Sequence, residues 1–348
     1  MSPTRIVNAL PKHAPLHLVD SWYGDTELMD TSTALVTGGA GFIGSHLADA
    51  LLSEGMSVKV FDDFSAGSKV NLQDAIKNHP KELKIIKGDV RNLRALCNAL
   101  RDVDIVYHLA AACQWATLED PVLAHGVNAE GTLNLCRAVR RSNPKLFIHM
   151  SSSEIYGDAT RPAIDENHPT RPKTPYAASK VAAEAYVNAF QETYDLPCVI
   201  LRPFNTFGPR QRGFKRYKSD RYGGMVSKSV YAALHGGEIV VYGDGKQTRD
   251  YMYVKDCVKG IVGAAQEALR GQILNLGSGR AITMIEIVEQ VARATGNSEL
   301  KVTYKPERPG DVRQQLGDIS LAQRLIGFKP SYDFAKGLWE YVHWARSI

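Results

Sequence analysis

The sequence predicts an α/β protein built on a doubly wound parallel-sheet Rossmann domain, with a smaller, interleaved C-terminal lobe. Two observations predict this fold. A glycine-rich turn, Thr37-Gly-Gly-Ala-Gly-Phe-Ile-Gly-Ser-His46, joins an apolar run to a helical pattern near the start of the chain. From residue 33 onward, apolar runs of strand length alternate with longer segments of helical period. Such alternation requires parallel strands, right-handed crossovers and helices on both faces of the sheet.

The predicted strands are short apolar runs between turn signals. The first is Ala34-Leu-Val-Thr37 with its neighbour Thr33, and residues 42–54 behind the glycine turn carry apolar side chains at helical spacing. A long helix is predicted from about residue 119 to 141. The five strand candidates are 33–37, 57–61, 83–87, 104–108 and 145–150. In such a sheet, ligands bind at the carboxyl ends of the strands.

The glycine turn has a spacing that suits a pyrophosphate. Gly38 allows the sharp turn, Gly41 lets the backbone approach phosphates, and Gly44 lets the helix lie close to the strand. The second strand ends in Asp62-Asp63, eighteen residues past Gly44. An acid at this place accepts hydrogen bonds from the adenosine ribose and repels a 2′-phosphate. The sequence therefore predicts NAD rather than NADP; the alternative is a structural turn with solvated aspartates.

Small and polar residues follow the later strands. Asp89 follows the third strand, Ala110-Ala-Ala112 the fourth, and Ser151-Ser-Ser-Glu154 the fifth. The small alanines would let a cofactor lie against the backbone, although packing of a helix on the sheet explains them equally well.

We divide the chain into three parts. Residues 1–32 form an N-terminal arm without a sustained period, which is either loose or docked on the body or a second subunit through Leu16, Trp22 and their neighbours; we favour docking. Residues 33–202 are the predicted NAD-binding domain. Glycines and prolines punctuate shorter elements beyond it, so 203–348 is predicted to be mainly a substrate-binding lobe with the last Rossmann elements interleaved.

The bulk composition is that of an ordinary enzyme. The chain has 348 residues, of which 44% are hydrophobic and 23% charged. Its net charge of +5 is modest, which argues against nucleic-acid binding. Five well-separated cysteines without a Cys-x-x-Cys pair indicate reduced thiols and no metal site. No apolar run is long enough to cross a bilayer, so we expect a cytoplasmic protein that does not bind membranes.

Tyr176-Ala-Ala-Ser-Lys180 places a phenol and an ammonium four residues apart on one helix face. A nearby cation stabilises phenolate, so we expect a lowered pKa for Tyr176, which would take a proton from a sugar hydroxyl near neutral pH. Ser152, at the end of the fifth strand, can share a hydrogen bond with that hydroxyl. The three side chains predict a proton-abstracting site beside a nicotinamide.

At this point the chain resembles a family, the extended short-chain dehydrogenase/reductases that act on nucleotide sugars. The resemblance covers about residues 33 to 346. Its ordered motifs are Thr37-Gly-Gly-Ala-Gly-Phe-Ile-Gly44, Gly88-Asp89, Val127-Asn128-x-x-Gly-Thr132, Ser151-Ser-Ser-Glu-Ile-Tyr-Gly157, Tyr176/Lys180, Arg202-Pro-Phe-Asn205, Gly243-x-Gly-x-x-Thr-Arg-Asp-Tyr251 and Arg308-Pro-Gly-Asp311.

The resemblance implies a tightly held NAD, with Asp62 at the ribose, Asp89 at the adenine, and Ser152, Tyr176 and Lys180 at the hydride-transfer centre. The full set of implied cofactor contacts is Gly38, Gly41, Phe42, Ile43, Gly44, Asp62, Asp63, Asp89, Val90, Ala110, Ala111, Asn128, Tyr176 and Lys180.

The resemblance also implies a nucleotide-diphosphate sugar as substrate, bound by Ser153, Asn205, Arg249, Arg308 and Asp311. Arginine pairs bidentately with phosphate oxygens, which agrees with this assignment. Without the family, Arg249 and the Arg308/Asp311 pair would be read as surface ion pairs. The family further implies a homodimer packed through the helices near 119–141 and 175–194, where a row of alanines allows close packing.

Glu154 divides the possible reactions. If the end of the fifth strand is extended, Ser152 and Glu154 point to the same side, and a carboxylate lies near the sugar. A 4-epimerase needs no catalyst beyond Ser152, Tyr176 and Lys180, whereas a 4,6-dehydratase or a decarboxylase needs help near C5. Glu154 is either such a catalyst or a structural acid paired with an arginine or a backbone N–H.

Other motifs favour an epimerase. Ser153 stands where dTDP-glucose 4,6-dehydratases have an acid, and the tail from Glu307 to Ser320 looks most like UDP-hexose 4-epimerases. We therefore predict an NAD-dependent 4-epimerase of a UDP-hexose or UDP-hexuronate, which works through a transient 4-keto sugar and enzyme-bound NADH. The alternatives are a 4,6-dehydratase or UDP-glucuronate decarboxylase that uses Glu154 and, from another class, a non-catalytic NAD-binding scaffold.

Two further features bear on the substrate. The basic stretch 211–222 either closes over the diphosphate, meets a substrate carboxylate, or is a solvated loop. Gln315 stands where smaller residues in some relatives admit an N-acetyl group, so its size disfavours UDP-GlcNAc.

Overall fold

The computed structural model describes residues 32–211, 224–297, 299–307 and 311–348. The predicted docking of the arm and nearly all of the basic stretch 211–222 lie outside the described residues. In the described part no helix is long and apolar enough to cross a membrane. All five cysteines are free.

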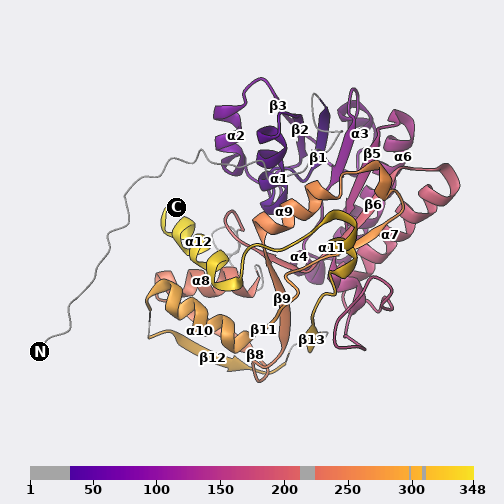
Figure 1. The fold of residues 1–348 in the computed structure, drawn as a ribbon. Helices are drawn as coiled ribbons and strands as arrows, with labels where there is room; N and C mark the ends of the chain where they lie inside the picture. The colour runs from indigo at the N-terminus through magenta and orange to yellow at the C-terminus, as the bar shows by residue number, and fades with distance from the viewer. Residues whose placement is uncertain (1–31, 212–223, 298, 308–310) are drawn as a thin grey trace, which may run out of the picture.

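A seven-stranded sheet, parallel throughout, forms the centre of the molecule (Figure 1). Each predicted strand is present within one residue of its predicted bounds, which confirms the doubly wound fold. In sheet order the strands are β10 (Ile273–Leu276), β6 (Cys198–Pro203), β5 (Leu146–Met150), β4 (Ile105–His108), β1 (Thr33–Thr37), β2 (Ser57–Asp62) and β3 (Leu83–Lys87).

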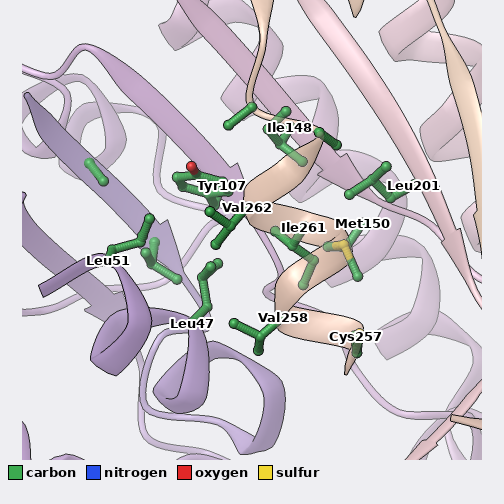
Figure 2. Packing of buried hydrophobic residues seen from close by; sticks show 14 of the residues in the cluster. Leu47, Leu51, Tyr107, Ile148, Met150, Leu201, Cys257, Val258, Ile261 and Val262 are labelled. Atoms are coloured by element: carbon green, nitrogen blue, oxygen red, sulfur yellow. The ribbon is translucent and has the colours of Figure 1, made fainter. Parts of the chain in front are cut away.

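Helices cover both faces of this sheet. On one face, Leu47 and Leu51 of one helix meet Val258, Ile261 and Val262 of another over the central strands (Figure 2). That face carries α1 (Phe42–Ser53), α9 (Val254–Gly263) and α11 (Ser320–Ile326). The opposite face carries α3 (Leu93–Ala99), α6 (Gly131–Ser142) and α7 (Pro175–Tyr194). Two elements from late in the chain complete this domain: β10 is an edge strand of the sheet, and α9 is one of the helices packed on its face.

The predicted long helix is interrupted. Asp120 caps a short helix through the N–H of Leu123, Pro121 occupies its first position, and a π-helical segment then leads into α6. π-helical turns are rare and occur often at functional sites. The segments are α4 (Gln114–Glu119), α5 (Pro121–Ala124), the π-helix η2 (His125–Glu130) and α6.

The C-terminal elements build a second core, in which Phe207, Tyr253 and Leu338 are buried. Its strands are β7 (Asn205–Phe207), β8 (Glu238–Tyr242), β9 (Thr248–Tyr253), β11 (Ala281–Thr283), β12 (Lys301–Lys305) and β13 (Gln314–Gln315). Its helices are α8 (Met225–His235), α10 (Met284–Thr295) and α12 (Phe334–Arg346). The shorter segments elsewhere are α2 (Gln73–Asn78), η1 (Lys69–Leu72), η3 (Ser153–Tyr156) and η4 (Glu267–Leu269).

Candidate active site

The glycine turn between β1 and α1 has the geometry of a phosphate cradle. Gly38 has φ of +70°, and a Cβ there would lie 2.7 Å from the backbone nitrogen of Ala110. A Cβ on Gly44 would collide with the carbonyl oxygen of Gly38. Phe42 and Ile43 open α1, and no side chain caps its N-terminus. Free N–H groups at a helix N-terminus favour an anion.

Asp62 ends β2 beside this turn. Its carboxylate accepts hydrogen bonds from the N–H groups of Ala40 (2.9 Å) and Phe64 (2.8 Å). Burial raises the pKa of Asp62, and these two hydrogen bonds oppose the rise. Asp63 is exposed and accepts from Ser65. The residues present fit a dinucleotide, because the acid, the glycine cradle and the uncapped helix end come together at one sheet edge.

The residues after β3 and β4 border the same edge. Asp89 accepts hydrogen bonds from the guanidinium of Arg91, which lower the pKa of the carboxyl. Val90 is buried. The N–H of Ala110 donates to the hydroxyl of Thr37 at 3.4 Å, and Ala111 is half-buried beside it.

Asn128 lies against the loop that follows β4. It is 1% exposed, and its amide is used inside the protein: Oδ1 accepts from the N–H of Ala112 (2.8 Å), and Nδ2 donates to Ala112 O and to Ser179 Oγ. The π-helical turn carries Asn128 into this position. Its side chain therefore shapes the site by holding the loop after β4 against α7.

Ser152, Tyr176 and Lys180 come together where β5 ends against the first turns of α7. A hydrogen bond links Tyr176 to Ser152. Nζ of Lys180 donates to the carbonyl of Met150 at 2.9 Å, and burial lowers the pKa of Lys180 to about 8. Thr174 caps α7 through the N–H of Ala177, which fixes the start of the helix.

The expected lowering of the Tyr176 pKa is wrong for the protein without its ligands. Burial raises the pKa of Tyr176 to about 12, and the hydrogen bond with Ser152 is the interaction that opposes the rise. The free energy lost when a phenolate is removed from water is larger here than the stabilisation that the neighbouring groups provide. Glu154 and Cys113 also interact with Tyr176, and both raise its pKa.

Glu154 reaches the site by a different route from the one predicted. The chain after Ser152 is not extended but forms the 3-10 turn η3, and the hydroxyl of Ser152 accepts from the N–H of Glu154 at 3.2 Å. The carboxylate nevertheless interacts with Tyr176, Arg249 and Asp311. Burial raises the pKa of Glu154, and the charge of Arg249 opposes the rise.

Strand pairing and side-chain hydrogen bonds bring four of the five predicted substrate residues together. Gln315 lies opposite Arg249, and Asn205 opposite Tyr251. Nη2 of Arg249 donates to Oδ1 of Asp311 at 2.5 Å. Ser153 is buried, and Arg308 lies outside the described residues.

Gln315 connects the C-terminal strands to the end of β5. It is fully buried, its Oε1 accepts from Asn205 (3.0 Å), and its Nε2 donates to the carbonyl of Ser153 (3.3 Å). These two hydrogen bonds hold its side chain beside Asn205 and Ser153, two of the predicted substrate residues.

Tyr251 is a site residue for which the sequence reasoning gave no role. Its hydroxyl interacts with Arg249, Asp311 and Glu154, and burial raises its pKa to about 12. The signal was present, because Tyr251 ends the Gly243 motif.

Comparisons with known proteins agree with this arrangement. A family model described as GDP-mannose 4,6 dehydratase matches residues 35–341. A UDP-glucose 4-epimerase from Mycolicibacterium smegmatis is 34% identical over 319 residues, which cover 90% of this chain and 98% of that protein.

Solved structures give the same result. A UDP-N-acetylglucosamine 4-epimerase from Methanobrevibacter ruminantium M1, in complex with UDP-N-acetylmuramic acid, is 37% identical with a TM-score of 0.84, covering 92% of this chain and 99% of that one. A dTDP-glucose 4,6-dehydratase from Streptomyces venezuelae with NAD bound is 30% identical with a TM-score of 0.83, covering 90% and 97%. The chain belongs to the extended short-chain dehydrogenase/reductases, among the NAD-dependent nucleotide-sugar epimerases and dehydratases.

Proposed function

We propose that this protein is an NAD-dependent 4-epimerase of a nucleotide-diphosphate sugar, a UDP-hexose or UDP-hexuronate. One observation carries the choice of reaction. Among the described residues, Glu154 is the one carboxylate that interacts with Tyr176, and its neighbour at the position of a second acid is the buried Ser153. Eliminating water across C5 and C6 requires a base at C5 and an acid for the leaving hydroxyl, whereas epimerisation at C4 requires no such pair beyond the Tyr176 that removes the 4-hydroxyl proton. The two epimerases compared above are 34% and 37% identical, which supports the same choice.

The chain's own residues then have distinct tasks. Ser152 and Tyr176 bind the 4-hydroxyl of the sugar, and Tyr176 takes its proton. When bound, NAD supplies the acceptor for the C4 hydride and the donor for its return. Because burial raises the pKa of Tyr176 to about 12, its phenolate needs positive charge. Lys180, one helical turn along, is the cation that the chain offers, and it stays charged below pH about 8.

Asn205, Arg249 and Asp311 are proposed to hold the nucleotide diphosphate. Arg249 is half-buried on β9 and already oriented by the Asp311 carboxylate. An oriented guanidinium loses less freedom when it binds phosphate oxygens. Lys173 adds a second positive charge nearby, since its Nζ donates to the carbonyl of Asp311 at 3.1 Å.

A second candidate reaction uses Glu154 as a base at C5, in a 4,6-dehydratase or a decarboxylase. A specific observation favours it: the carboxylate is buried beside Tyr176, its pKa is raised, and no described residue donates a hydrogen bond to it. A carboxylate with a raised pKa is a better base than an ordinary one.

Incubation with nucleotide sugars tests the proposal. Purified protein and NAD are incubated separately with UDP-glucose, UDP-GlcNAc, UDP-glucuronate, dTDP-glucose and GDP-mannose, and the products are analysed by chromatography with mass spectrometry. The proposal predicts an unchanged mass at a new retention time. Loss of water or of carbon dioxide would establish the second candidate. Binding of NAD without turnover of any of the five would favour a non-catalytic scaffold.

We also propose a homodimer. Ala178, Ala185 and Ala189 of α7 are exposed, and so are Leu118 (49%) and Val122 (77%) on the segments packed beside it. Small residues allow helices to approach closely, and exposed apolar residues grouped on neighbouring helices mark an interface. Sedimentation equilibrium should give twice the mass of one chain. The Ala185→Glu variant should sediment with the mass of a single chain.

A further inference from the structure

A row of buried polar side chains crosses the sheet beneath the active site. Thr37 of β1 is paired with His108 of β4, which is paired in turn with His149 of β5. All three are at most 1% exposed. The two imidazole rings lie 5.4 Å apart, on the face that carries α6 and α7.

His108 is the centre of a hydrogen-bond chain. Its Nδ1 lies 2.7 Å from the hydroxyl of Thr37, and its Nε2 lies 2.9 Å from the hydroxyl of Thr132 on α6. The Thr132 hydroxyl also lies 2.6 Å from the carbonyl of Asn128. At its other end, the Thr37 hydroxyl accepts from the N–H of Ala110, in the loop that borders the cofactor edge.

The direction of every hydrogen bond along this path follows from the position of one proton, that of the Thr132 hydroxyl. A carbonyl only accepts, so the Thr132 hydroxyl donates to Asn128 O and has no proton left for His108. Nε2 of His108 therefore carries the ring proton and donates to Thr132. Nδ1 is then an acceptor, which receives the proton of the Thr37 hydroxyl. Only the neutral Nε2–H tautomer of His108 gives a hydrogen-bond partner to the Thr37 hydroxyl, both ring nitrogens and the Thr132 hydroxyl at the same time.

Asn128 extends the connection to the catalytic helix. Its Nδ2 donates to Ser179 Oγ at 2.9 Å, and that hydroxyl donates to the carbonyl of Tyr176 at 2.7 Å. His108 thus lies in the middle of a hydrogen-bonded path that begins at the Ala110 loop. The path ends at Asn128, which is connected through Ser179 to the backbone of Tyr176 in α7.

We propose that His108 is a positioning residue: in its Nε2–H tautomer it fixes the distance between the cofactor loop at Ala110 and the catalytic Tyr176. The inference rests on the proposed function for the role of Tyr176, but the tautomer and the connection do not depend on it. Neither the family motif nor the comparisons assign a task to this ring.

The surroundings keep the ring neutral. Burial, together with the positive charge of Lys180, lowers the pKa of His108 to about 3. The other titratable group that faces it is His149 of β5, itself fully buried and with a lowered pKa. The chain of hydrogen bonds therefore stays in one arrangement across the range in which an enzyme of this kind works.

Thr132 gives the sharpest test, because valine replaces its hydroxyl with a methyl group of similar size, whereas serine retains the hydroxyl. Thr132→Val should lower kcat about tenfold or more, since small displacements of catalytic groups are costly, and should leave KM for the nucleotide sugar within about twofold. Thr132→Ser should restore most of kcat. Thr295→Val is the matched control, because Thr295 is also buried and its hydroxyl also donates to the carbonyl four residues back, but in α10. A kcat for Thr132→Val no lower than that of Thr295→Val would overturn the proposal.

A second measurement does not need turnover. Nitrogen-15 NMR of the protein labelled in its ten histidines should show one ring, absent in His108→Phe, that stays in the neutral Nε2–H form from pH 5 to 9. The Kd for NAD should rise in His108→Phe. An Nδ1–H tautomer, or titration of this ring near pH 6.5, would contradict the inference. If the wild type turned over no nucleotide sugar, the proposed function would fail while the tautomer and the NAD affinity still tested this connection.

Discussion

Arg249 and Asp311 are 62 positions apart in the sequence, yet Nη2 of Arg249 donates to Oδ1 of Asp311 at 2.5 Å. The arginine side chain is 11% exposed and the aspartate 34% exposed. Lys173 also donates to the backbone carbonyl of Asp311, so the aspartate is held from two sides. The pair places a partly desolvated guanidinium within interaction range of Glu154, and thus beside the proposed position of the sugar diphosphate.

Arg249→Met should weaken binding of the nucleotide sugar. Hydrogen bonds to charged groups contribute about 1.5–3 kcal/mol, so KM should rise roughly 10- to 100-fold while kcat changes little. Steady-state kinetics measure both. Arg270→Met is the control, because Arg270 pairs with Glu267 at an exposed position and its loss should change neither constant. An unchanged KM for Arg249→Met would remove this residue from the binding site.

Glu154→Gln distinguishes a catalytic from a structural carboxylate. Glutamine keeps the shape of the side chain but cannot act as a base. If the protein is an epimerase, turnover should stay within about fivefold of the wild type, whereas Tyr176→Phe should lower it by a factor of about 10² to 10⁴. Product formation under saturating substrate measures both. A Glu154→Gln variant as inactive as Tyr176→Phe, with normal NAD binding, would make Glu154 a catalyst.

Gly44→Ala should abolish NAD binding or the fold around it, because the added Cβ collides with the carbonyl of Gly38 and separates α1 from β1. Overpacking of this kind costs about 1–3 kcal/mol or more. Gly126→Ala is the matched control, since a Cβ there meets only the side chain of Arg91 at 3.5 Å. Calorimetric titration with NAD and thermal unfolding compare the two. Equal NAD affinity in both variants would exclude the glycine turn between β1 and α1 as the binding site of the pyrophosphate.

His149→Phe should not destabilise the protein at pH 7.5, because neither ring nitrogen has a hydrogen-bond partner among the described residues. His108→Phe should cost about 1–3 kcal/mol, since it deprives Thr37 and Thr132 of partners.

The pH dependence of the same variant gives a second readout. The pKa of His149 is lowered well below its ordinary value, so below pH about 6.5 the unfolded chain binds a proton that the folded chain does not. The wild type should therefore lose stability as the pH falls from 6.5, and His149→Phe should lose less. Chemical unfolding at pH 7.5 and 5.5 measures the difference. The same loss in both proteins would show that His149 does not contribute.

Much of the fold was predictable because its signals are local. The strands are runs of Val, Ile and Leu, and the turn needs glycine at positions that steric contacts fix. The role of Asp62 follows from its place at the end of β2. The meeting of Arg249 with Asp311 came only from motifs shared with a family, since no local pattern relates positions 62 residues apart.

Three features differ from what the sequence patterns predict. The π-helical turn at His125–Glu130 turns Asn128 inward, and period-3.6 reasoning does not foresee it. An extended chain is expected after Ser152, but the Ser152 hydroxyl accepts from the N–H of Glu154 two residues on and caps a 3-10 turn. The raised pKa of Tyr176 arises from burial by elements distant in sequence, whereas the sequence shows only its neighbour Lys180.

The measurement that tests the central claim most directly is conversion of the accepted nucleotide sugar in D₂O, with mass spectrometry of the product. A 4-epimerase moves hydride away from C4 and back without breaking the bond to the C5 hydrogen, so we predict a product of unchanged mass that carries no solvent deuterium. A product that has gained deuterium at C5, with loss of water or carbon dioxide, would contradict the epimerase and assign the chemistry to Glu154.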